Sequence, residues 1–147
     1  MNREPTSPVW PSAPPPAAEQ GLTWSLDHVS QLPRVRAQLR RHLAEGRSED
    51  PTPESTDLDD QLVLAFDEMA SNALRHGGGG VVARVAPHGA SWLVEVCDEA
   101  PVSPPTPAVD RDPSQGGLGL HLIAEMATAH GWHTHGRAKS VWALLPR

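Results

Sequence analysis

The chain has 147 residues, enough for one ordinary domain and too few for two. Its net charge of −6 disfavours binding to a nucleic acid, and its single cysteine, Cys97, excludes an intrachain disulfide. No apolar run approaches the roughly 20 residues of a membrane span, and the N-terminus lacks a secretory pattern. We therefore expect a cytoplasmic protein that contacts neither nucleic acid nor membrane.

The N-terminal segment is rich in proline. Six of the 16 prolines fall between Pro5 and Pro16, among small and polar residues. Such a segment buries too little apolar surface to offset the entropy lost on ordering it. We therefore predict a disordered tail over residues 1–20 and a folded domain over residues 21–147. A solvated Trp10 is the expectation within this tail, and a docking peptide around it is the alternative.

Beyond the tail, segments in which apolar residues recur every two residues, as in strands, are interspersed with segments in which they recur about every 3.6 residues, as in helices. A polar linker (47–57) separates the first two helical patterns, and a proline-dense segment (99–115) has no periodicity. The pattern predicts a two-layer α/β (α+β) sandwich, with a mainly antiparallel mixed sheet covered by helices on one face. The predicted strands are 22–26, 81–86, 92–96, 132–135 and 141–145, and the predicted helices are 30–45, 57–76 and 118–130.

The helix predicted over 57–76 carries three polar residues at a spacing of four. Glu68, Asn72 and His76 therefore share one edge of its apolar stripe. At a half-buried edge, a carboxylate can act as a general base and an amide oxygen can coordinate Mg²⁺. The alternative is that all three are ordinary solvated helix residues.

Asp98 ends the apolar strand predicted before the long loop. A carboxylate at a strand end often only caps a turn. The functional interpretation is that Asp98 faces a pocket and accepts a hydrogen bond from an amino group of a ligand, such as that of adenine. Cys97 beside it is interpreted as a small buried residue, not a reactive thiol.

A glycine-rich segment, Gln115-Gly116-Gly117-Leu118-Gly119-Leu120, opens the third predicted helix. Glycines permit close backbone approach and positive φ, and a helix N-terminus favours an anion. The segment therefore suits phosphate binding, although it lacks the Lys-Ser/Thr ending of a P-loop and the position of a Rossmann glycine turn. A flexible hinge is the alternative.

Together the three motifs resemble the conserved boxes of the GHKL (Bergerat-fold) ATPase superfamily. Glu-x-x-x-Asn-x-x-x-His (68–76) resembles its N-box, Asp98 its first glycine box, and the 116–120 segment its second. The similarity spans about residues 22–145 and is greatest to stand-alone anti-sigma-factor serine/threonine kinases of actinobacterial type. The resemblance implies a histidine-kinase-like ATPase fold with residues 99–115 as the ATP lid.

The resemblance also implies roles for individual residues. Glu68 would be the general base, and Asn72 would hold Mg²⁺. His76 would lie near the phosphates, and Asp98 would bind the adenine amino group. The backbone of the second glycine box would contact the phosphates, which adds Gly116, Gly117, Leu118, Gly119 and Leu120 to the nucleotide-binding residues.

The resemblance further implies protein partners. Arg36 on the first helix would contact a small antagonist protein, although Arg34, Arg40 and Arg41 lie on the same helix. The implied activity is ATP- and Mg²⁺-dependent phosphorylation of that antagonist, which frees the kinase to hold a sigma factor. A homodimer would also fit the family.

The sequence departs from the family pattern in two places. Ala100 stands where the first glycine box usually has glycine, and Arg111 is the only basic residue of the lid segment. These departures favour the alternative, a nucleotide-binding regulatory module that binds a protein partner without phosphotransfer. A third hypothesis is a transition-metal site at His130, His133 and His135, which no cluster of cysteines or carboxylates supports.

Overall fold

A computed structural model describes residues 10–47, 50–76, 80–99 and 118–147, which form a five-stranded sheet and three α-helices. Every element expected from the sequence pattern is present, although several boundaries differ. The strands are β1 (Leu22–Leu26), β2 (Val81–His88), β3 (Ser91–Asp98), β4 (Ala129–His135) and β5 (Ala138–Pro146). The helices are α1 (Leu32–Glu45), α2 (Pro53–His76) and α3 (Leu118–Met126), and a short 3₁₀ turn, η1 (Val29–Gln31), precedes α1.

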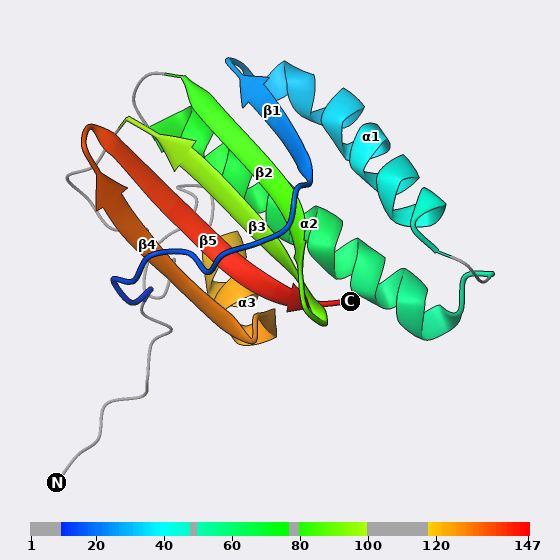
Figure 1. Ribbon diagram of the computed structural model, residues 1–147. Helices are drawn as coiled ribbons and strands as arrows, with labels where there is room; N and C mark the ends of the chain where they lie inside the picture. The colour runs from blue at the N-terminus through cyan, green and yellow to red at the C-terminus, as the bar shows by residue number, and fades with distance from the viewer. Residues whose placement is uncertain (1–9, 48–49, 77–79, 100–117) are drawn as a thin grey trace, which may run out of the picture.

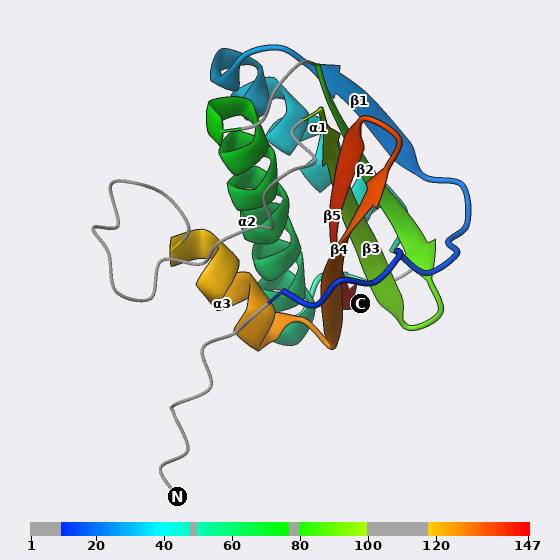
Figure 2. The same ribbon diagram turned by 90° about the vertical axis from the view of Figure 1, so that its left-hand side faces the viewer.

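The sheet forms one layer and the helices form the other. The strand order is β1-β2-β3-β5-β4, and the pairings between these strands are antiparallel throughout. Figure 2 shows α1, α2 and α3 on one face of the sheet, and Figure 1 shows the opposite face toward the viewer. The predicted two-layer α/β sandwich is confirmed, with antiparallel strand pairs in place of a mixed sheet. Within the described ranges, no helix is long and apolar enough to cross a membrane.

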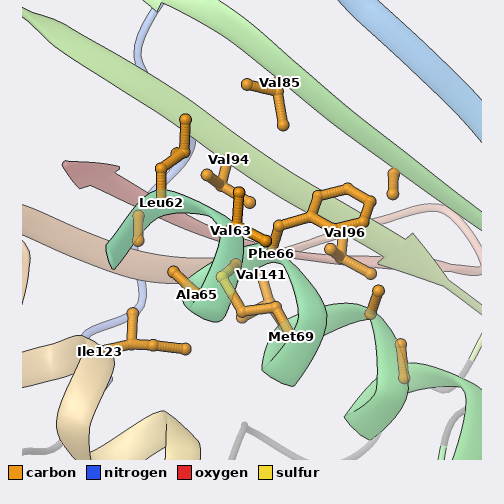
Figure 3. Packing of buried hydrophobic residues seen from close by; sticks show 14 of the residues in the cluster. Leu62, Val63, Ala65, Phe66, Met69, Val85, Val94, Val96, Ile123 and Val141 are labelled. Atoms are coloured by element: carbon orange, nitrogen blue, oxygen red, sulfur yellow. The ribbon is translucent and has the colours of Figure 1, made fainter. Parts of the chain in front are cut away.

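The core lies between α2 and the sheet (Figure 3). Apolar residues at helical spacing on α2 pack against alternate residues of the strands, as the two periodicities require. The Phe66 ring is fully buried and meets the ring of Trp24 edge-on, with 5.1 Å between centroids. This packing fixes how α2 is rotated, so its edge residues lie beside the sheet. Core members in Figure 3 include Leu62, Val63, Ala65, Phe66, Met69, Val85, Val94, Val96, Ile123 and Val141.

Helix α2 begins at Pro53, inside the segment predicted as a polar linker, and not at Asp57. The Ser55 N–H donates to the Thr52 hydroxyl (3.1 Å), and the Thr52 N–H donates to the Ser55 hydroxyl (2.8 Å). This reciprocal pair is a capping box, and a proline at the first helical position needs no N–H. The linker prediction was wrong here because polar capping residues have the same composition as a linker.

Helix α3 ends at Met126, and β4 begins at Ala129. The predicted helix was longer and ended before Gly131, but Gly131 lies inside β4. A Cβ atom added there would lie 2.9 Å from the Trp142 ring and 3.0 Å from the Pro11 carbonyl oxygen. The glycine is needed because other segments cross the strand closely, not because a helix ends.

Residues 10–20 are folded onto the domain, so the predicted disordered tail is wrong for this part of the chain. The Trp10 side chain is 2% exposed and packs against His130, with 4.8 Å between ring centroids. Next to it, the Trp132 N–H donates to the Pro11 carbonyl oxygen, and the Ala13 N–H donates to the Trp132 carbonyl oxygen. The segment therefore continues the sheet at the outer edge of β4. Residues 1–9 lie outside the described part of the chain.

The rest of this segment crosses the helix-free face of the sheet (Figure 1), and we call residues 10–20 the N-terminal strap. The Trp142 indole N–H donates to the Ala13 carbonyl oxygen (2.9 Å). Leu93 alternates with the core residue Val94 and so points away from the helices, yet it is fully buried. We infer that the strap covers this apolar part of the outer face. Composition alone did not predict this, because the surface that buries the strap comes from strands far along the chain.

Replacing Trp10 with alanine should lower the free energy of unfolding by roughly 3–5 kcal/mol, the usual cost of deleting a buried tryptophan. Chemical denaturation followed by circular dichroism measures this loss. Trp10→Phe is the control, with a much smaller expected loss, because the indole N–H has no hydrogen-bond partner among the described atoms. A Trp10→Ala protein as stable as the wild type would show that the strap does not pack in solution.

Candidate functional site

The facing ends of β3 and β5 bring two charged residues together at one end of the sheet. Asp98 is the last residue of β3, and it is paired in register with Lys139 of β5. Asp98 follows the core residues Val94 and Val96 at the two-residue period, so it faces the helices. Its side chain is buried, with the residue only 4% exposed. A carboxylate is rarely placed so deeply unless it binds a partner or a ligand.

The last turns of α2 lie over this end of the sheet. Asn72 and His76 are one turn apart on the helix, and both line a hollow together with Asp98 and Lys139. The structure thus brings three of the predicted site residues into one place. The remaining lining is apolar and consists of Met69, Ala73, Val96, Leu120 and Val141.

The lining of this hollow combines apolar side chains with a few polar groups. Small-molecule pockets have this kind of lining, in which the polar groups orient the ligand, although they usually measure about 300–1,000 Å³. The space between these side chains measures about 20 Å³, which suits a water molecule and is smaller than a purine ring. A purine ring therefore does not fit between these side chains in their present positions.

Glu68 lies one turn before Asn72 on the same helix, but it is not among the described residues that line the hollow. Its side chain instead lies against Gly119 of α3, where an added Cβ atom would be 2.5 Å from Cγ and 2.6 Å from Cδ of Glu68. Burial raises the pKa of the Glu68 carboxyl above its ordinary value. The charge of Asp67 raises this pKa further, whereas Arg75 lowers it. Glu68 is therefore a stronger base than an exposed glutamate.

Arg36, predicted to contact a partner, lies on α1 and forms an ion pair with Asp67 (2.6 Å). This pair joins α1 to the residue that directly precedes Glu68. The Arg36 side chain is 39% exposed, so the guanidinium is also accessible from solvent. A second ion pair, Arg40–Asp60 (2.8 Å), joins the same two helices farther from the site.

The predicted phosphate-binding segment is described only from Leu118, where α3 begins. Gly116 and Gly117 lie outside the described residues. Leu120, in the first turn of α3, is buried and lines the hollow. The N-terminal end of α3, whose free N–H groups suit an anion, is therefore next to the hollow.

Sequence analysis missed Lys139 as a site residue. Its position opposite Asp98 depends on the register between β3 and β5, which no hairpin turn connects. In a hairpin the length of the turn fixes the register, but two strands that are far apart in the chain give no such guide. Met69 and Val141 were not predicted as site residues either, because an apolar pattern does not tell which of its members border a pocket.

The histidine hypothesis receives no support from the described part of the chain. No group of three histidine, cysteine or acidic residues within it is arranged to hold a metal ion. His130 instead packs against Trp10. Cys97 is half-buried, and burial, followed by the charge of Glu95, raises the pKa of its thiol. A thiol that stays protonated fits the structural role expected for it.

Comparison with known proteins identifies the family of this chain. A family model described as a histidine kinase-like ATPase domain matches residues 26–144. Among solved structures, the Acinetobacter baumannii histidine kinase AdeS is similar at 11% sequence identity, over 87% of this chain and 68% of that chain, with a TM-score of 0.46. The search of curated proteins found no match. The family match covers α1, α2, α3 and the described lining of the hollow. The chain therefore belongs to the histidine kinase-like ATPase domain family.

Proposed function

We propose that this protein is an ATP- and Mg²⁺-dependent serine/threonine kinase that phosphorylates a small antagonist protein. In its unphosphorylated state the antagonist would compete with a transcription regulator, such as a sigma factor, for the kinase. The observation that carries the proposal is the buried Asp98 carboxylate, set in an apolar hollow beside Asn72 and His76 of α2.

Asp98 is suited to adenine recognition. The exocyclic amino group of adenine is a donor, and a buried carboxylate is a strong acceptor for it. Met69, Val96 and Val141 provide apolar surface for the ring. Guanine has an acceptor at the corresponding position, so the same carboxylate would repel it. The hollow is therefore assigned to the adenine of ATP.

Asn72 and the start of α3 are suited to the phosphate end. The Asn72 side-chain oxygen is the kind of hard ligand that Mg²⁺ takes, and Mg²⁺ neutralises phosphate charge when bound. His76 lies one turn farther along α2 and borders the same hollow. We assign it as a hydrogen-bond donor to a phosphate oxygen. The free N–H groups at the start of α3 add donors for the phosphates.

Glu68 is assigned as the general base. It would accept the proton of a serine or threonine hydroxyl on the antagonist as the hydroxyl oxygen bonds to the γ-phosphorus. The bond from this phosphorus to the β–γ bridging oxygen breaks, and ADP leaves. Positioning and charge neutralisation supply most of the catalysis in such transfers, so the orientation of Glu68 matters as much as its basicity.

The proposed partner surface includes Arg36 on α1. Its guanidinium is partly exposed and is held in place by Asp67, so it is presented to a partner at little further entropic cost. An acidic group on the antagonist would match it. Homodimer formation is part of the same proposal, and its interface is left open.

The second candidate is a nucleotide-binding module that sequesters a partner without phosphotransfer. Ala100 in place of the family glycine favours it, as does the presence of a single basic residue, Arg111, in the lid segment. Both candidates require ATP binding, and only the kinase requires Glu68.

Asp98→Asn should raise the Kd for ATP by about 10- to 100-fold, because a hydrogen bond to a charged group contributes roughly 1.5–3 kcal/mol. Calorimetric titration with ATP and Mg²⁺ measures the change. Glu99→Gln is the matched control, because it removes the same charge from the next residue, which is exposed. Equal weakening by both variants would indicate a general charge effect, and absence of wild-type binding at millimolar ATP would refute the nucleotide site.

Glu68→Gln should leave the Kd for ATP within about threefold of the wild-type value and reduce phosphotransfer by at least about 100-fold, the usual contribution of a general base. The assay follows acid-stable label from γ-labelled ATP onto serine or threonine of soluble proteins from the source cells. Glu54→Gln, at the other end of α2, is the control and should transfer normally. Unchanged transfer by Glu68→Gln would remove the base assignment, and no transfer by the wild type would favour the binding module.

Transfer should depend on pH through Glu68, which acts as a base only when ionised. Activity should therefore fall as the pH drops through the Glu68 pKa, which lies above that of an ordinary glutamate. Asp67→Asn removes a charge that raises this pKa, so the acid limb of the pH–rate profile should move to lower pH. Asp60→Asn is the matched control, since Asp60 also pairs with an arginine of α1 and is not among the charges that shift Glu68. A limb that moves equally in both variants, or in neither, would contradict the assignment.

A further inference from the structure

Helices α2 and α3 touch at Glu68 and Gly119. A Cβ atom at residue 119 would be 2.5 Å from Cγ and 2.6 Å from Cδ of Glu68, and closer still to Oε2. Real Cβ atoms essentially never come that close to another heavy atom. The backbone of α3 thus occupies the space beside the Glu68 side chain, and this arrangement exists only because residue 119 has no side chain.

Backbone conformation does not explain this glycine. Within the described residues, positive φ occurs at Gly89 and Gly136, and Gly119 lies in α3 with a φ that alanine also adopts. The glycines of this segment were predicted to permit positive φ and close approach of the backbone to a phosphate. For Gly119, the positive-φ explanation is wrong, and the obstacle to a side chain is Glu68 itself.

We propose that Gly119 is a positioning residue for Glu68: by lacking a side chain, it lets α3 pack directly against the glutamate and hold its carboxylate in one orientation. The proposal rests on the base role given to Glu68 in the proposed function. It adds a steric role to a residue of the second glycine box, separate from any backbone contact with phosphate.

The steric effect of a side chain at residue 119 would fall mainly on the carboxylate. The three nearest atoms that it would strike all belong to the Glu68 side chain and none to the backbone of α2, so the side chain is the part that must shift. An alanine keeps the backbone N–H of residue 119, so a phosphate contact through that N–H would survive. Displacement of a catalytic group by about 1 Å can lower a rate by about 100-fold. Gly119→Ala should therefore affect catalysis far more than ATP binding or stability.

The first test measures the contact by thermal unfolding, without reference to activity. Alanine favours a helix over glycine, so Gly119→Ala should raise Tm where nothing opposes it. In the wild-type background the clash with Glu68 offsets this gain, whereas Glu68→Ala removes the clash. The shift in Tm caused by Gly119→Ala should therefore be more positive by about 3 °C in the Glu68→Ala background. Equal shifts in the two backgrounds would overturn the proposal.

The second test measures positioning with ATP, Mg²⁺ and the labelled-transfer assay. Gly119→Ala should keep the Kd for ATP within about threefold and lose at least about 30-fold in transfer rate. Gly80→Ala is the matched control, since a Cβ atom there meets nothing within 4 Å and its φ is not positive, and it should transfer at the wild-type rate. A loss in Kd as large as the loss in rate, or an equal rate loss in Gly80→Ala, would refute the positioning role.

The two tests separate this proposal from the proposed function. If the wild type transfers no phosphate, the kinase function fails, and the difference in Tm shifts still decides whether Gly119 holds the Glu68 side chain. If the wild type transfers phosphate and Gly119→Ala transfers equally well, the kinase function stands and the positioning role is wrong.

Discussion

The packing of α2 against the sheet is the constraint on which the rest of the structure depends. Phe66 and Met69 commit one face of the helix to the core, and both are buried almost completely. Interiors packed this closely do not allow a helix to rotate by small steps. The helix edge that carries Glu68, Asn72 and His76 is therefore fixed by the same contacts that stabilise the fold. A substitution that turned α2 would disturb core and site together.

Local patterns were sufficient to predict the elements of this fold and, apart from the start of α2, long-range contacts decided what was missed. The alternation in β1 and the apolar spacing in α1 depend only on neighbours in sequence. Gly131 follows an amphipathic segment, where a helix end is the simplest interpretation, yet its small size is required by Trp142 on another strand. Trp10 lies in a proline-rich segment that cannot form a core by itself, and the domain supplies the surface that buries it.

The same distinction applies to the site. Glu68, Asn72 and His76 were found because one helix sets their spacing, and Asp98 because a carboxylate ends an apolar strand. Whether they lie together depends on tertiary structure: Asn72, His76 and Asp98 line one hollow, whereas Glu68 lies against Gly119 of α3. Lys139 carries no local signal of this kind, since it becomes a site residue only through the register of two strands far apart in the chain.

Asp67 connects the proposed partner surface to the proposed base. Its carboxylate is bonded to Arg36 on α1, and its charge also raises the pKa of Glu68. If the antagonist binds through Arg36, it contacts the guanidinium that is paired with Asp67. Binding then changes the electrostatic potential at Glu68, because the charge of Asp67 raises the Glu68 pKa. Linkage then requires the reverse effect: ionisation of Glu68 changes the affinity for the antagonist by the same factor. In a module that only binds partners, the Arg36–Asp67 pair would join two helices and do nothing more. In a kinase, the same pair would make the strength of the base depend on whether its substrate protein is bound.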